Sequence, residues 1–88
     1  MENYFNIVNR LQNELELIKN KLFWIPEPDR SRAKRMVKYA ERELRIARDF
    51  METSYKIDPS NLLLIGGNIR NAYFAIRQLK LLLNKYLH

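Results

Sequence analysis

The chain contains no cysteine and a single histidine, His88, which is its last residue. Without cysteine it can form neither disulfides nor thiolate metal sites. With one histidine it cannot assemble a Ser-His-Asp triad, a Cys-His pair or a multi-histidine metal centre from its own side chains. Neighbouring carboxylates such as Glu41 and Glu43 are two residues apart, so on a helix they point about 200° away from each other. These absences predict a chain that is not an enzyme, holds no metal or cofactor and takes no small-molecule substrate.

Glycine and long apolar runs are also rare, and acidic residues are absent from one third of the chain. The only glycines, Gly66 and Gly67, do not form a phosphate-binding loop pattern. No apolar run approaches the roughly 20 residues that span a bilayer, and the N-terminal residues do not resemble a secretory signal. We therefore expect a cytoplasmic protein with no membrane contact. Residues 1–28 sum to a charge of −1, residues 29–58 to +3 and residues 59–88 to +4 without any acidic residue. The net charge of +6 thus belongs to the second and third segments.

Three apolar stripes follow one rhythm, with spacings that alternate between four and three residues. The first runs from Tyr4 to Ile25, the second from Ala33 to Met51 and the third from Leu62 to Tyr86. This a/d pattern is typical of helices that pack at small crossing angles. The period of two that a half-buried strand requires is not sustained anywhere. The pattern predicts an all-α fold.

Prolines mark the breaks between the stripes. Pro26-Glu27-Pro28 cannot lie inside a helix, because proline lacks the amide hydrogen and disfavours helical geometry in the preceding residue. Asp58-Pro59 is a typical helix start. The expected helices cover residues 3–25, 30–56 and 59–87. Since the connections are short, we predict an antiparallel three-helix bundle that forms a single domain over residues 1–88.

Gly66 and Gly67 lie within the third stripe. Two glycines inside a helix cost on the order of 1.5–2 kcal/mol relative to alanine. The apolar spacing nevertheless continues undisturbed from Ile65 to Ile69. We predict one continuous helix; the alternative is a hinge or a loop that separates a short fourth helix.

The second segment carries the feature that points to a class of partner. Eight of the sixteen basic residues lie between Arg30 and Arg48, and all but Arg32 fall within an arc of roughly 140° on a helix. Such a surface suits polyanions, and the planar arginine fork favours phosphate or carboxylate. The candidate nucleic-acid-binding residues are Arg30, Lys34, Arg35, Lys38, Arg42 and Arg45.

Two other interpretations of this basic surface remain open. It could bind an acidic protein, or it could be an ordinary solvated surface in which Glu41 pairs with Arg45 and Lys38 along the helix. If nucleic acid binds, we expect contact with phosphates and no reading of base sequence. The helices are longer than those of helix-turn-helix domains, and neither a zinc finger nor a stacking sheet is possible.

Apolar residues outside the stripes form a second candidate surface. Leucines and a phenylalanine align on the outer side of the third helix, where they are either wide flanks of the core or a protein interface. The candidate interface residues are Leu63, Phe74, Leu81, Leu64 and Leu82. Trp24 precedes the prolines, and we expect it to close one end of the bundle.

The composition is rich in leucine, isoleucine, lysine, asparagine and tyrosine, and the chain is short, basic and free of cysteine. In this it resembles the small helical accessory subunits of archaeal B-family DNA polymerases, which implies a role in DNA replication. The stretch from Asn71 to Ile76 is also similar to a helix of HEPN domains. The catalytic arginine-to-histidine motif of that family is missing, so the resemblance does not imply ribonuclease activity.

Together these features predict a non-catalytic accessory protein. It would dock on a larger protein through its extra apolar surface and contact nucleic-acid phosphates through the second helix. The alternatives are a structural homo-oligomer, or a regulator that binds an acidic protein partner without any nucleic acid.

Overall fold

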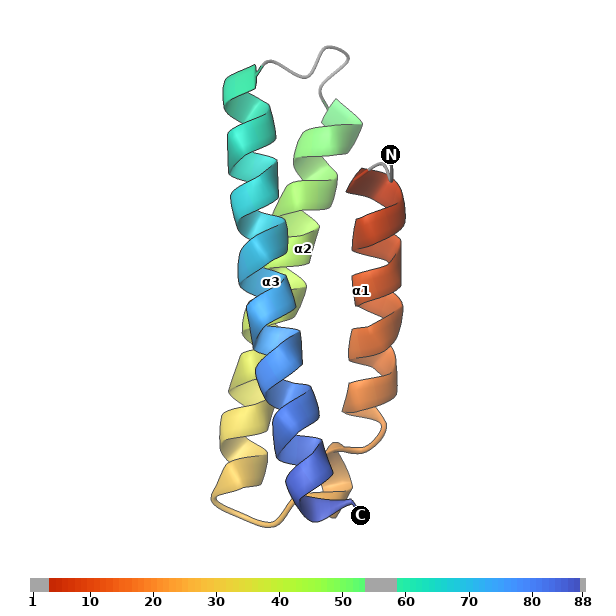
Figure 1. The fold of residues 1–88 in the computed structure, drawn as a ribbon, viewed down its shortest axis with the longest axis vertical. Coiled ribbons are helices and arrows are strands. Elements are labelled where there is room, and N and C mark those ends of the chain that lie inside the picture. Colours follow the sequence, from red (N-terminus) through yellow and green to blue (C-terminus); the bar gives the residue numbers. More distant parts are fainter. Residues whose placement is uncertain (1–3, 54–58, 88) are drawn as a thin grey trace.

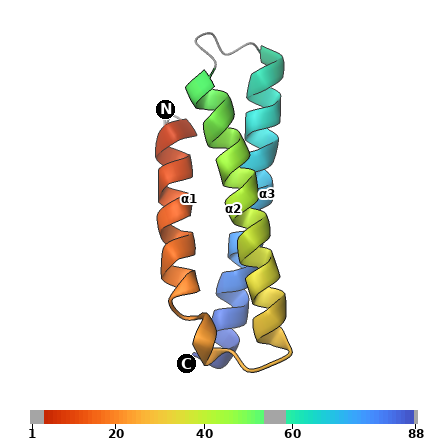
Figure 2. The same cartoon turned by 180° about the vertical axis from the view of Figure 1, so that it is seen from behind.

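Each apolar stripe folds into a helix in the computed structural model, which describes residues 4–53 and 59–87, with side chains for residues 4–52 and 64–87. The elements are α1 (Tyr4–Lys19), the 3₁₀ helix η1 (Leu22–Trp24), α2 (Asp29–Thr53) and α3 (Pro59–Tyr86). Consecutive α-helices run antiparallel in an elongated bundle, so α1 and α3 point in the same direction (Figures 1 and 2). The predicted all-α three-helix bundle is therefore confirmed.

The described core consists of residues of the three stripes together with Ala75. Leu15 on α1, Leu44 on α2 and Ile76 on α3 are almost completely buried, and no described polar or charged residue is buried with them. The α2 stripe contains three fully buried alanines at seven-residue spacing, Ala33, Ala40 and Ala47. Small side chains let helix axes approach closely, and α2 makes its most extensive contact with α3. The α2–α3 pair is thus the main packing unit, and α1 lies against it.

The predicted first helix is too long. The sequence pattern placed it over residues 3–25, but α1 ends at Lys19 and a tighter turn follows, in which the amide of Lys21 donates to the carbonyl of Ile18. Pro26 explains the end of this segment, because the residue before a proline avoids helical geometry. Ile25 is indeed extended, with ψ of 124°.

This break also corrects the role expected for Trp24. The side chain of Trp24 is 61% exposed, whereas Leu22 and Ile25 are buried and close the end of the core. A 3₁₀ helix has three residues per turn, so residues i and i+3 lie on the same side. Leu22 and Ile25 therefore point inward together, and Trp24 is turned outward.

The third helix passes through Gly66 and Gly67 without interruption, as predicted. No glycine among the described residues has a positive φ. A Cβ atom on Gly66 would lie 3.7 Å from the Tyr4 hydroxyl, and one on Gly67 would meet nothing within 4 Å. The glycines are therefore not needed for a turn or for close helix packing at this point.

Candidate nucleic-acid interface

Most basic residues of α2 lie on the outer side of the bundle, away from the buried alanine stripe. Five of the six predicted phosphate-binding residues are exposed and form no hydrogen bond or ion pair with any described residue. These five residues, named the basic face below, are Lys34, Arg35, Lys38, Arg42 and Arg45. They extend over about 17 Å of helix, at 1.5 Å per residue. The basic face is therefore a strip of cations that form no ion pair with the described residues, and the charge of Lys34 also contributes to the lowered pKa of Glu27.

The sixth predicted residue, Arg30, differs from the others. It is half-buried, and its Nε atom lies 3.0 Å from Oε1 of Glu27. Glu27 also accepts a hydrogen bond of 2.6 Å from the Ser31 hydroxyl. The hydrogen bonds from Ser31 and Arg30 hold the pKa of Glu27 below its ordinary value. Arg30 is thus part of a local cluster at the start of α2, and its charge is largely compensated.

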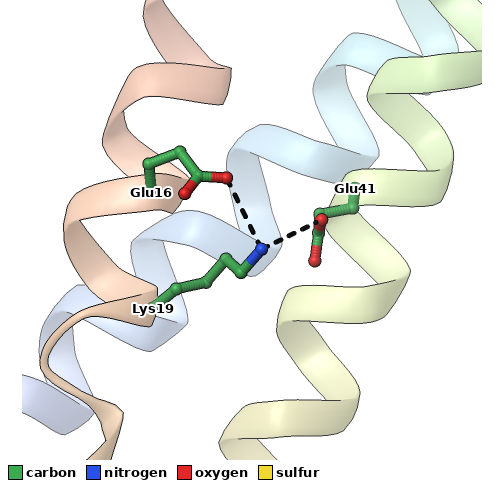
Figure 3. A network of polar contacts seen from close by, with 3 residues as sticks. All are labelled: Glu16, Lys19 and Glu41. Carbon is green, nitrogen blue, oxygen red and sulfur yellow. Dashed lines mark hydrogen bonds and ion pairs between the residues drawn. The ribbon is translucent and has the colours of Figure 1, made fainter.

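One carboxylate, that of Glu41, projects beside the basic face, and its partner lies on another helix. Lys19 at the end of α1 places its Nζ atom 3.5 Å from Oε2 of Glu41 and 3.5 Å from Oε1 of Glu16 (Figure 3). The charges of Glu41 and Glu16 raise the pKa of Lys19 above its ordinary value. The structure shows no ion pair from Glu41 to Arg45 or Lys38, the intrahelical partners considered from the sequence. The carboxylate expected to neutralise the basic face is therefore engaged elsewhere.

Arg48, the last basic residue of this stretch, is not part of the surface. It is partly buried between α2 and α1, where its guanidinium donates hydrogen bonds to Asn9 and, at 2.7 Å, to Oε1 of Gln12. Its Nε atom is buried and has no hydrogen-bond partner in the described part of the chain. Sequence periodicity placed Arg48 at the edge of the basic arc, and the packing of α1 covers that edge.

A groove lies between α1 and α2, along one side of the basic face. Its volume is about 540 Å³. The buried side chain of Leu15 contributes to its lining. The other lining residues are Gln12, Asn13 and Glu16 from α1 and Lys38, Glu41, Arg42 and Arg45 from α2. The sequence alone did not indicate this groove, because it arises only when the two helices are side by side.

The predicted protein interface divides into two surfaces. Phe74 and Leu81 are 53% and 56% exposed and share one side of α3, and the ring of Phe74 contacts that of Tyr73 edge-on at 6.1 Å. Leu64 and Leu82 lie roughly 80–100° further around the helix. Of these, Leu64 is exposed, whereas Leu82 is half-buried and packs against the core. The side chain of Leu63 lies outside the described residues.

A third exposed apolar surface was missed by the sequence analysis. The rings of Phe23 and Trp24 lie 4.8 Å apart in η1, and both are more than half exposed. The sequence signal for it was the run of four apolar residues from Leu22 to Ile25, of which a narrow bundle end can bury only part.

No group of three or more histidine or acidic side chains could hold a metal ion in the part of the chain that the structure describes. Over the same residues, no helix combines the length and apolar character that a membrane span requires.

Comparisons with known proteins give no relatives. No family model, curated protein or solved structure matches this chain significantly. The resemblances to polymerase accessory subunits and to a HEPN helix therefore stay predictions.

Proposed function

We propose that this chain is a non-catalytic accessory protein that contacts the phosphates of nucleic acid through α2 and docks on a larger protein through α3. The observation that carries the proposal is the basic face, five exposed cations without an ion-pair partner among the described residues. Glu41, the carboxylate beside them, is bound by Lys19. Like charges along one helix repel each other, and a polyanion removes this repulsion.

The dimensions of the basic face agree with contact to a phosphate backbone. Its length of about 17 Å corresponds to roughly five base-pair steps at 3.4 Å. Three of its five residues are arginines, which bind phosphate oxygens in a bidentate manner. Contacts of this kind position a protein on nucleic acid without selecting a base sequence. We therefore expect about four phosphate contacts and little sequence preference.

The salt dependence of duplex binding tests this proposal. For about four phosphate contacts, the logarithm of the association constant falls against the logarithm of salt concentration with a slope of roughly −3 to −4. Fluorescence anisotropy with two labelled duplexes of different base composition measures the slope, which is expected to be the same for both. A slope near zero, or affinity for only one of the duplexes, contradicts phosphate contact by the basic face.

The docking role rests on the exposed side chains of Phe74 and Leu81. A matched test replaces both with serine, which removes apolar surface without changing the charge. The proposal expects a monomer in light scattering for both proteins and unchanged DNA affinity in the serine variant. The same experiment tests the alternative of a structural oligomer. This alternative is favoured by Phe74 and Leu81, two half-exposed apolar residues that lie on one face of α3. A wild-type dimer that the serine variant loses, without DNA affinity in either protein, supports that alternative.

A further inference from the structure

We infer that the groove between α1 and α2 receives one unpaired nucleotide, so that the protein prefers single-stranded nucleic acid to a duplex. The inference rests on the proposed function and specifies which form of nucleic acid binds. The groove differs from the basic face in that its two sides carry different chemical groups. Three cations and one carboxylate line its α2 side, and two neutral amides, one carboxylate and Leu15 line its α1 side.

The cationic side carries Lys38, Arg42 and Arg45, which are exposed and form no ion pair with any described residue. These residues suit a phosphate group. On the α1 side, Gln12 accepts a hydrogen bond from Arg48 through Oε1, which leaves its Nε2 donors for a ligand. Asn13 is exposed and offers both a donor and an acceptor. Amides of this kind pair with the polar edges of bases.

Cross-helix contacts hold the two sides of the groove together at both ends. At one end Lys19 joins α1 to Glu41 of α2 (Figure 3), and at the other Arg48 joins α2 to Asn9 and Gln12 of α1. Glu41 and Arg48 are seven residues apart, which is about 10 Å along the helix. The groove is therefore short and bounded by a cross-helix contact at each end, and its volume of about 540 Å³ lies within the range of small-ligand sites.

The depth of the groove distinguishes single strands from duplexes. Leu15, which lines it, is only 2% exposed and so lies below the outer surface of the two helices. In a duplex the bases are stacked and paired, so only their edges are exposed in the grooves and no base can enter a recess in the protein. An unpaired base of a single strand can rotate outward and enter a recess, where its polar edge meets the amide groups of the α1 side.

The carboxylates of the groove favour a nucleotide over an acidic peptide. Glu16 and Glu41 contribute to the lining from both sides, and Lys19 is the single cation that joins them. A peptide segment rich in aspartate or glutamate would bring further carboxylates close to these two. A nucleotide carries its negative charge only on the phosphate, and its base can donate amino hydrogens to a carboxylate.

The test compares one labelled DNA strand of 15 nucleotides and mixed sequence, alone and annealed to its complement, at the same salt concentration. We expect wild type to bind the single strand more tightly than the duplex. Asn13→Leu should lower the ratio of single-strand to duplex affinity about fivefold, the effect of one lost hydrogen-bonding group. Asn20→Leu is the matched control, since Asn20 is exposed near the end of α1 but does not line the groove. This control should keep the wild-type ratio.

The outcomes separate the two proposals. Equal affinity for the single strand and the duplex overturns the nucleotide site, and so does an unchanged affinity ratio in Asn13→Leu. Phosphate contact by the basic face stands in either case if Arg35→Glu still weakens DNA binding. Arg35 belongs to the basic face and does not line the groove. Absence of binding to either DNA overturns both proposals. A polyglutamate peptide that displaces the strand from wild type, but not from Arg42→Glu, identifies an acidic segment as the occupant and overturns the nucleotide site.

Discussion

Arg48 and Arg35 show that arginines on one helix can have different roles. Arg48 is partly buried and donates hydrogen bonds to two side chains of α1, whereas Arg35 is exposed and forms no ion pair with a described residue. A hydrogen bond typically adds about 1 kcal/mol to stability, and groups that lose their buried partner add a further cost. Arg48 therefore belongs to the fold, and Arg35 is available for binding.

Replacement of Arg48 with alanine is expected to lower the free energy of unfolding by about 1–2 kcal/mol, because Asn9 and Gln12 lose their shared donor. Urea denaturation measures the change. Arg35→Ala is the matched control and should stay within about 0.5 kcal/mol of wild type. Similar losses in the two variants would show that Arg48 does not hold α1 against α2.

Replacement of Gly66 or Gly67 is expected to raise the free energy of unfolding instead of lowering it. Both are helical, neither has a positive φ, and the structure leaves space for a methyl group at each. Each change to alanine is expected to stabilise the protein by up to about 1 kcal/mol, because glycine is the poorer helix former. Thermal unfolding should show a rise of roughly 4–8 °C per kcal/mol for a domain of this size. A fall in the melting temperature in both variants would mean that α3 is broken there.

At the scale of elements, one contact ties the end of α3 to the start of α2. The hydroxyl of Tyr86 donates a hydrogen bond to Asp29, and Nζ of Lys85 lies 3.9 Å from the same carboxylate. The hydrogen bond to Asp29 is the main cause that raises the pKa of Tyr86, and burial and the negative charge of Asp29 add to it. The contact depends on a protonated phenol.

This contact predicts a stability change at alkaline pH. Because the pKa of Tyr86 is raised on folding, its contribution is fully present below the ordinary pKa of about 10 and is lost as the pH rises through the folded value. The difference in unfolding free energy between wild type and Tyr86→Phe should therefore be constant from pH 7 to about pH 9 and shrink above it. Urea denaturation over this range measures it. A difference that is independent of pH would remove the contact with Asp29 from the account.

The helices were predictable from the sequence because their apolar period is local and continuous. Every described stripe residue from Val8 to Leu83 is buried. The break after Lys19 was not predictable from that period, since the spacing of three between Leu22 and Ile25 fits both an α-helix and a 3₁₀ helix. For the same reason the exposure of Trp24 was predicted incorrectly.

The candidate site was predictable in part. The position of a cation around α2 follows from its number in the chain, so the arc of the basic face could be derived from the sequence. Whether each cation is paired depends on neighbouring helices. The contacts from Lys19 to Glu41 and from Arg48 to Gln12 join residues distant in the sequence, and helix periodicity contains no information about them.

At the scale of the whole molecule, positive charge occurs on two different helices. The basic face belongs to α2, while Arg70 and Arg77 are exposed on α3 without an ion pair among the described residues. The net charge of +6 attracts nucleic acid to the molecule as a whole. The proposed function is narrower than this general attraction, because it assigns phosphate binding to α2.

The most direct measurement of this claim compares two double charge reversals by fluorescence anisotropy with one labelled duplex at low salt. Arg35→Glu with Arg42→Glu alters the basic face, and Arg70→Glu with Arg77→Glu alters α3. Each Arg→Glu change lowers the net charge by two, so the net charge of both double variants is +2 instead of the wild-type +6 (6 − 4 = 2). Circular dichroism checks that both remain folded. The account predicts a loss of affinity of about 100-fold for the α2 variant and only a few-fold loss for the α3 variant. Equal losses in the two variants would contradict it, because net charge alone would then explain the binding.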